Sequence, residues 1–95
     1  MDLDYYINEI IKWRASRGPP LTDEDTIYNL ALLTEEVGEL AESITKDFPI
    51  ENIKEEIADV FVTFVIVAQC KGINLNEAFI KKLIILDNKC KLKGE

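Results

Sequence analysis

The residues of this chain that are best suited to chemistry fall in two short acidic motifs: Glu35-Glu36-x-x-Glu39 and Glu55-Glu56-x-x-Asp59. In each motif two carboxylates lie three residues apart, so on a helix they share one face and point about 60° apart. An ordinary surface helix would place a Lys one turn after a Glu, so that opposite charges attract. Here the carboxylates repel each other, and the motifs contain no cation that would relieve the repulsion. We therefore predict a bound divalent metal ion.

The predicted metal site takes one pair of carboxylates from each motif: Glu36, Glu39, Glu56 and Asp59. Mg²⁺ is a hard ion that prefers oxygen ligands in octahedral geometry, and we expect that Mn²⁺ can substitute for it. Sixteen residues separate Glu39 from Glu56, enough to end one helix, turn and bring the next helix back antiparallel. That return would place the two pairs level with each other, and helix bundles build metal sites in this way.

A solvated acidic surface is the alternative interpretation, because Glu-x-x-Glu pairs are common on exposed helices. Two features favour the metal site. Apolar residues directly follow both motifs, so the carboxylates border the core. Gly38 lies inside the first motif, where Ala would favour a helix by up to about 1 kcal/mol, and this glycine suggests the close approach of another helix or a ligand.

The composition narrows the class of protein. A chain of 95 residues with 47% apolar residues makes a single domain, 1–95, with a modest core. A formal net charge of −7 disfavours binding to nucleic acid or to anionic membranes. The chain has no His, which excludes Ser-His and Cys-His catalysis and the Glu-x-x-His pairs of ferritin-like di-iron centres. Cys70 and Cys90 are expected to be buried or half-buried residues and not a disulfide framework.

Neither a signal peptide nor a membrane span is expected. The acidic start, Met1-Asp2-Leu3-Asp4, lacks the positively charged region of a signal peptide. The longest apolar run, residues 60–68, is too short for a membrane span of about 20 residues. We therefore expect a cytoplasmic protein.

Four helical segments must position the motifs, at about 3–17, 24–46, 51–71 and 75–91, and no strand is predicted. Gly18-Pro19-Pro20 ends the first segment, and Asp47-Phe48-Pro49 separates the second from the third. Thr22-x-x-Asp25 offers a start for the second helix, with Asp23 as the other candidate. Gly72 offers a C-terminal cap for the third helix, and Asn74-x-x-Glu77 a capping box for the fourth.

The apolar faces of the second and third helices predict how they pack. The expected core side of the second helix consists of Ile27, Leu30, Ala31, Thr34, Val37, Ala41 and Ile44. The third helix is apolar on nearly every face between residues 60 and 68, so it must be buried all round. Four helices of one chain can hardly surround one of their own, and we therefore expect a second subunit as cover.

The motifs and their surroundings resemble the MazG-like all-α nucleoside triphosphate pyrophosphohydrolases. The signature of that family is E-E-x-x-E followed, after a variable gap, by E-x-x-D. This chain matches it at Leu33-Thr34-Glu35-Glu36-Val37-Gly38-Glu39-Leu40-Ala41-Glu42 and Glu55-Glu56-Ile57-Ala58-Asp59-Val60. The resemblance extends upstream to Trp13 and Ser16-Arg17-Gly18, and downstream to residues 72–78 and Lys82. It implies an all-α, four-helix bundle-like protomer that is oligomeric.

The resemblance also implies an activity. Such enzymes cleave a nucleoside triphosphate between its α- and β-phosphates and release the monophosphate and pyrophosphate. Mg²⁺ held by the carboxylates would neutralise the triphosphate, and Glu35 or Glu36 would accept a proton from the attacking water. Arg17 and Lys82 would contact phosphate oxygens, and Trp13 would stack on the base.

Two further positions, Lys54 and Leu86, are not expected to contact the substrate. Lys54 is better interpreted as a solvated surface residue. Relatives often carry a polar residue one turn after the Lys of the last helix, whereas this chain has Leu86 there, which puts phosphate or sugar contacts from that helix in question.

The resemblance implies a homodimer or a homotetramer built as a dimer of dimers, and a role in nucleotide-pool house-cleaning. The main alternative is a non-catalytic helical module of the same fold that binds a nucleotide or a protein. The intact set of acidic residues argues against that alternative. The preferred base and sugar are not specified by the sequence.

Overall fold

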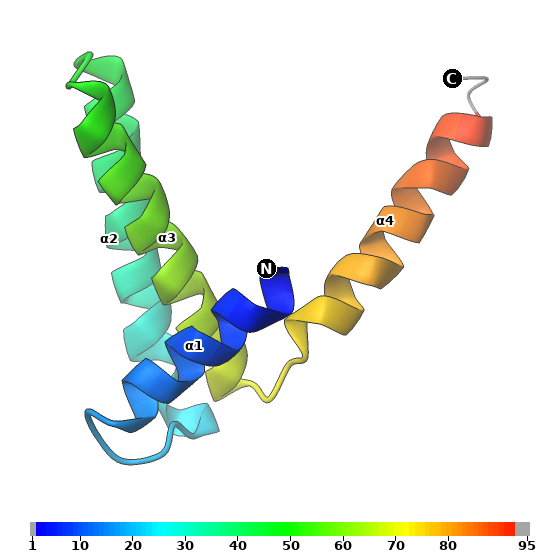
Figure 1. The fold of residues 1–95 in the computed structure, drawn as a ribbon, viewed down its shortest axis with the longest axis horizontal. Helices are drawn as coiled ribbons and strands as arrows, with labels where there is room; N and C mark the ends of the chain where they lie inside the picture. Colours follow the sequence, from blue (N-terminus) through cyan, green and yellow to red (C-terminus); the bar gives the residue numbers. More distant parts are fainter. Residues whose placement is uncertain (1, 93–95) are drawn as a thin grey trace.

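The computed structural model describes the backbone of residues 2–92 and the side chains of residues 2–89. All regular secondary structure in this part of the chain is helical (Figure 1). The α-helices are α1 (Leu3–Ala15), α2 (Thr26–Thr45), α3 (Ile50–Cys70) and α4 (Leu75–Leu92), and a short 3₁₀ helix, η1 (Asp23–Asp25), precedes α2. The predicted all-α fold with four helices is therefore confirmed for the described residues, which contain no strand. The side chain of Cys90, predicted to be buried or half-buried, lies outside them.

Three of the α-helices pack together, whereas the fourth points away. α2 and α3 run antiparallel side by side and form a hairpin, and α1 crosses α3 at the end far from the α2–α3 turn (Figure 1). α4 leaves that end in a different direction, so that the hairpin and α4 resemble the two arms of a V. Bundle-like packing within one chain is therefore confined to α1, α2 and α3.

Local hydrogen bonds end α3 and start α4 where the sequence predicts. Gly72 follows α3 with a φ of 65°, and the Ile73 N–H donates to the carbonyl oxygen of Ala68 at 3.0 Å, as in a Schellman C-cap. The Asn74 side chain accepts a hydrogen bond from the Glu77 N–H at 3.1 Å. The predicted cap of α3 and the predicted start of α4 are both confirmed.

The start of the second helix differs slightly from the prediction. The Thr22 N–H donates to the Asp25 carboxylate at 2.8 Å, as the reciprocal pairing requires. The residues after Thr22 first form η1, and α2 begins only at Thr26. The short Asp side chain can reach back to Thr22 across a tight 3₁₀ turn, so the α-helix starts later than the expected position near Glu24.

The hydrophobic core lies where α1 crosses α3 and where α4 begins. Its buried residues are Ile7, Val65, Ala68 and Leu75, and the side chains that pack against them are Ile10, Ile11, Phe61, Phe64 and Phe79. The rings of Phe64 and Phe79 stack with centroids 6.2 Å apart, which ties the start of α4 to α3. Cys70 is buried, as predicted. The core therefore holds the first turns of α4, while its later turns are exposed.

The predicted core side of α2 is wrong. All of its residues are exposed: Ile27, Leu30, Ala31, Thr34, Val37, Ala41 and Ile44. The buried and half-buried face of α2 instead includes Leu33, Glu36, Leu40 and Ser43, and Ser43 is only 1% exposed. α2 thus carries two faces with apolar residues. The face that packs on α3 is the one where small Ser43 permits a close approach and two leucines fill the remaining space.

The close approach predicted at Gly38 is absent within the described chain. A Cβ added to this glycine would meet no atom within 4 Å. Gly38 lies on the exposed part of α2, because the rotation of the helix that buries Glu36 turns Gly38 outward.

α3 lies between α1 and α2, so helices of the same chain cover much of its apolar segment (Figure 1). Residues 60–67 are half-buried except for Val65, which is fully buried together with Ala68. A second subunit as further cover stays a prediction. Within the described residues, no helix has the length and apolar character needed to cross a membrane.

Candidate metal centre

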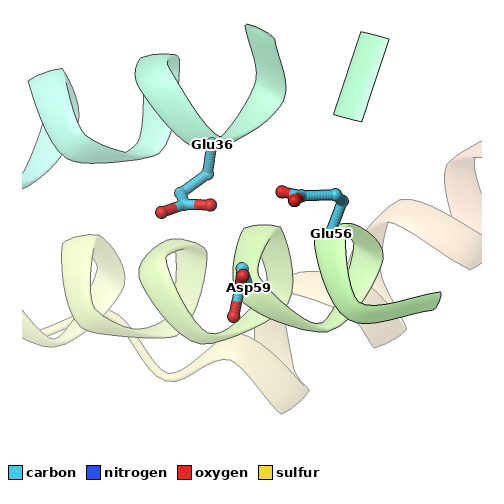
Figure 2. A group of neighbouring side chains, drawn as sticks. All are labelled: Glu36, Glu56 and Asp59. Carbon is cyan, nitrogen blue, oxygen red and sulfur yellow. The ribbon is translucent and has the colours of Figure 1, made fainter. Parts of the chain in front are cut away.

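Three acidic side chains from two helices meet inside the hairpin. Glu36 projects from α2 toward α3, which carries Glu56 and Asp59 on successive turns (Figure 2). One carboxylate oxygen from each of the three lies within 4.8 Å of the others. The three-residue spacing on α3 and its antiparallel return past α2 create this arrangement. Carboxylate oxygens gathered in this way can serve as ligands for one divalent cation.

The two glutamates each hold one oxygen in a buried position without a partner. Oε2 of Glu36 and Oε2 of Glu56 are buried, and neither accepts a hydrogen bond. Asp59 is exposed, so the cluster is open to solvent on its side. A buried carboxylate oxygen without a donor is unfavourable. A ligand that brings positive charge therefore fits the place where these two atoms lie.

The pKa values of Glu36 and Glu56 are both raised above the ordinary value of a glutamate. Burial raises the pKa of Glu36, and the negative charges of Glu39 and Asp59 raise it further. Burial is also the main cause that raises the pKa of Glu56, again followed by the charges of Glu39 and Asp59. A divalent cation would act in the opposite direction, because it stabilises the ionised carboxylates. The residues present therefore fit a metal ion chemically.

Glu39 is not part of the three-residue cluster. It follows Glu36 by one turn of α2, is exposed, and stands at the border of the site, where its charge acts on both buried glutamates. A hydrogen-bond interaction with the Glu39 side chain also raises the pKa of both glutamates, so Glu39 stays a predicted ligand at the edge of the cluster. Glu35 and Glu55, the first residues of the two motifs, are also exposed.

The ion pairs of the described chain lie away from the cluster: Lys12–Glu9, Lys46–Glu42, Lys54–Glu51 and Lys71–Asp23. Lys54 contacts Glu51 at 3.0 Å with both side chains largely exposed, which agrees with a solvated surface role. The protein side chains described here thus provide no cation for the three clustered carboxylates.

A groove of about 620 Å³ lies between α1 and α3, next to the cluster. Asp59 lines it, so the groove and the carboxylates share a wall. The remaining walls are mostly apolar and aromatic: Leu3, Tyr6, Glu9, Ile10, Trp13, Ala58, Phe61 and Val62. A concave apolar surface with a few polar groups at its edge is the usual form of a small-molecule site.

The structure brings two of the three predicted substrate contacts to this groove region. Trp13 lines the groove and is 47% exposed. The guanidinium of Arg17 lies over its ring, 4.7 Å from the centroid, in a cation–π contact. Lys82 is exposed on α4, the arm that points away from the hairpin (Figure 1). Within one chain, Lys82 is therefore separated from the carboxylates.

The sequence does not predict the groove or the two residues Tyr6 and Glu9 that help to line it. Leu3, Tyr6, Ile10 and Trp13 recur at three- and four-residue spacing on one face of α1, which is also typical of a core face. The two aromatic side chains are half exposed in the structure. Their size and polar tips were the signal available in the sequence, because large aromatic residues line ligand sites as well as cores.

The model of the MazG nucleotide pyrophosphohydrolase domain family matches residues 25–90. The matched region spans α2, α3 and most of α4, and it includes the three clustered carboxylates. α1 and its side of the groove lie outside the match. No curated protein and no solved structure matches the chain.

Proposed function

We propose a function for this chain from the family to which it belongs, the MazG nucleotide pyrophosphohydrolase family. In this proposal the chain hydrolyses a nucleoside triphosphate to the monophosphate and pyrophosphate, with Mg²⁺ as cofactor. The observation that carries the proposal is the pair of buried, unpartnered oxygens on Glu36 and Glu56, which face each other across α2 and α3. A chain with no catalytic task would gain stability by replacing one of these glutamates with an apolar residue or an amide.

Glu36, Glu56 and Asp59 would hold the metal, and Glu39 would join them from the border of the site. When bound, the ion supplies positive charge that neutralises the triphosphate and makes water a stronger acid. Mn²⁺ has the same preference for oxygen ligands and would substitute. Ionised carboxylates are the metal-binding form, so metal and protons compete for Glu36 and Glu56.

Glu35 and Glu36 are the proposed proton acceptors. The reaction breaks the bond between the α- and β-phosphates, adds the oxygen of water to one phosphorus and releases one proton that a base must take up. Glu36 lies within the cluster, where it could deprotonate a water near the three carboxylates. Glu35 precedes it in the sequence and is exposed to solvent, so it is the other proposed acceptor.

The groove between α1 and α3 is the proposed site for the nucleoside. Its base would lie against Trp13, and its phosphates would extend toward Asp59, which lines the same groove. Arg17, which already lies over the indole ring, would turn its guanidinium toward a phosphate. Lys82 would contact a phosphate from α4, which requires that α4 approach a carboxylate cluster. We further propose that the chain assembles as a homodimer or homotetramer and removes unwanted nucleotides from the cellular pool.

A panel of canonical and damaged ribo- and deoxyribonucleoside triphosphates tests the proposal through the release of pyrophosphate. Hydrolysis of at least one of them in the presence of Mg²⁺, and its loss with EDTA, is expected. Binding of a nucleotide without pyrophosphate release from any of the panel would favour the non-catalytic module instead.

A further inference from the structure

Two acidic side chains, Glu9 and Asp59, are the charged groups that line the groove between α1 and α3 among the described residues. Asp59 belongs to the carboxylate cluster on α3, whereas Glu9 lies on α1, the other wall of the groove (Figure 1). The proposed metal accounts for Asp59 but gives Glu9 no task. A groove with a negative charge on each wall favours a ligand that brings positive charge or N–H groups to both of them.

Glu9 lies beside the aromatic part of the groove. Tyr6 and Trp13 precede and follow it by one turn of α1, and they are 50% and 47% exposed. Side chains three or four residues apart are neighbours on a helix, so the carboxylate of Glu9 stands within reach of a planar group that lies against these rings. A base stacked on Trp13 can therefore turn one edge toward Glu9.

The Glu9 carboxylate has one weak partner on its own helix. Its Oε1 accepts a hydrogen bond from Nζ of Lys12 at 3.4 Å, and the side chains of Glu9 and Lys12 are 48% and 75% exposed. Lys12 is not among the residues that line the groove. An exposed ion pair of this kind contributes little to stability, so it does not withhold the carboxylate from a ligand in the groove.

The edge of a nucleobase decides whether a carboxylate can bind it. An ionised carboxylate only accepts hydrogen bonds. Guanine presents two neighbouring donors, N1–H and the N2 amino group, which match the two carboxylate oxygens as the paired donors of an Arg do. Adenine and cytosine place one amino group beside a ring nitrogen that is an acceptor, and uracil and thymine place one N–H between two carbonyl oxygens. An acceptor that faces a carboxylate oxygen leaves both without a donor, so a carboxylate favours guanine over the other bases.

We propose that Glu9 selects the base and that the substrates of this chain are guanine nucleoside triphosphates. The guanine lies against Trp13 and donates hydrogen bonds from N1–H and the N2 amino group to Glu9, while the phosphates extend toward Asp59. The inference rests on the proposed function for the reaction and adds the class of substrate to it. α1 lies outside residues 25–90, so the family match does not specify this contact.

Trp13 is the single Trp of the chain, so its fluorescence reports on the groove without any turnover. Titration with GMP, IMP and AMP, with excitation where the bases do not absorb, gives a dissociation constant for each. IMP differs from GMP only by the missing N2 amino group. GMP should bind at least about tenfold more tightly than IMP, because IMP lacks one hydrogen bond to a charged group. Equal dissociation constants for GMP and IMP, or fluorescence that responds to none of the nucleotides, would overturn the inference.

Glu9→Gln provides a test that a purely structural role of Glu9 would not pass. The amide keeps one acceptor and replaces the other with a donor, which opposes guanine but matches the amino group and neighbouring ring nitrogen of adenine. The variant should bind GMP about tenfold more weakly than the wild type and AMP at least about threefold more tightly. An equal change for GMP, IMP and AMP would show that the substitution disturbs the groove as a whole, and it would contradict base selection by Glu9.

Glu51→Gln is the matched control for this variant. Glu51 also pairs with a Lys three residues later, Lys54 at 3.0 Å, and both side chains are largely exposed. It is not among the residues that line the groove. Its replacement should therefore change the dissociation constants of GMP and AMP by less than about twofold.

Pyrophosphate release separates this inference from the proposed hydrolysis. With Mg²⁺, kcat/KM for GTP should exceed that for ITP at least about tenfold, and Glu9→Gln should shift the preference from GTP toward ATP. Hydrolysis of GTP and ITP at equal kcat/KM, or a wild-type preference retained in Glu9→Gln, would overturn the selection of guanine and leave the hydrolysis standing. Tight binding of GMP that depends on Glu9, without hydrolysis of any triphosphate, would retain the recognition of guanine and overturn the proposed hydrolysis.

Discussion

The hairpin and α4 differ in the kind of group that each leaves unsatisfied. The hairpin buries polar atoms, since Glu36 and Glu56 each hold one oxygen away from water without a partner. α4 does the reverse and exposes apolar side chains such as Leu83, which is 65% exposed. Buried polar atoms and exposed apolar faces are the two informative departures from the usual distribution of residues.

The hairpin and α4 would therefore be satisfied by two different kinds of partner. Positive charge would satisfy the hairpin, whereas apolar surface would satisfy α4. A metal ion would supply only the first, and the proposed second copy of the chain would supply the second. Changes to the carboxylates should therefore affect metal binding and catalysis, while changes to α4 should affect assembly.

The largest effect is expected from a substitution in the hairpin. Glu56→Gln keeps the shape of the side chain and removes one charge from the cluster, and pyrophosphate release should fall at least about 1,000-fold because a metal contributes several kcal/mol to transition-state stabilisation. Glu55→Gln removes the same charge from the exposed neighbour and should change the rate by less than about tenfold. Equal losses in both variants would contradict the distinct role of the buried glutamate.

Metal addition should stabilise the hairpin by a smaller amount. At a free Mg²⁺ concentration 100 times the dissociation constant, the free energy of unfolding should rise by about 2.7 kcal/mol, because only the folded chain gathers the three ligands. Urea denaturation with and without Mg²⁺ measures this change. Glu56→Gln should remove most of it, and Leu83→Glu should not, if the site is complete within one hairpin.

The free energy of unfolding of the metal-free chain should depend on pH because of the two buried glutamates. Burial raises the pKa of Glu36 and Glu56 in the folded state, so between the ordinary and the raised pKa the folded chain binds more protons than the unfolded chain. The free energy of unfolding must then decrease as pH rises through that window. Urea denaturation at a series of pH values should show this decrease without metal. It should be weaker in Glu56→Gln, and Mg²⁺ should offset it.

The smallest effects are expected at the two turns that follow α2 and α3. Asp47 has a φ of 56° and Gly72 a φ of 65°, so both occupy the left-handed region that favours glycine. Asp47→Gly should therefore raise the free energy of unfolding by about 0.5 kcal/mol, and Gly72→Ala should lower it by about 1 kcal/mol. A stabilising Gly72→Ala would contradict the described cap of α3.

Local signals made much of this fold predictable. Gly72 and Asn74 mark the end of α3 and the start of α4, because their conformations and hydrogen bonds depend only on neighbouring residues. The meeting of Glu36 with Glu56 and Asp59 follows from helix periodicity and an antiparallel return.

Long-range packing was harder to infer. α2 has apolar residues on two faces, and periodicity cannot tell which face packs on α3 and which stays exposed, so the core side containing Leu30 and Val37 was assigned wrongly. The groove between α1 and α3 depends on the crossing of two helices that are distant in sequence, and no local pattern specifies that crossing.

Binding of Mn²⁺, followed by electron paramagnetic resonance, tests the central claim most directly. The wild-type chain and Glu55→Gln should both bind the ion at a site that Mg²⁺ competes for. Glu56→Gln should bind it at least about 100-fold more weakly, because a ligand and its charge are lost. Binding by Glu56→Gln that is as tight as binding by the wild type would contradict a metal centre formed by Glu36, Glu56 and Asp59.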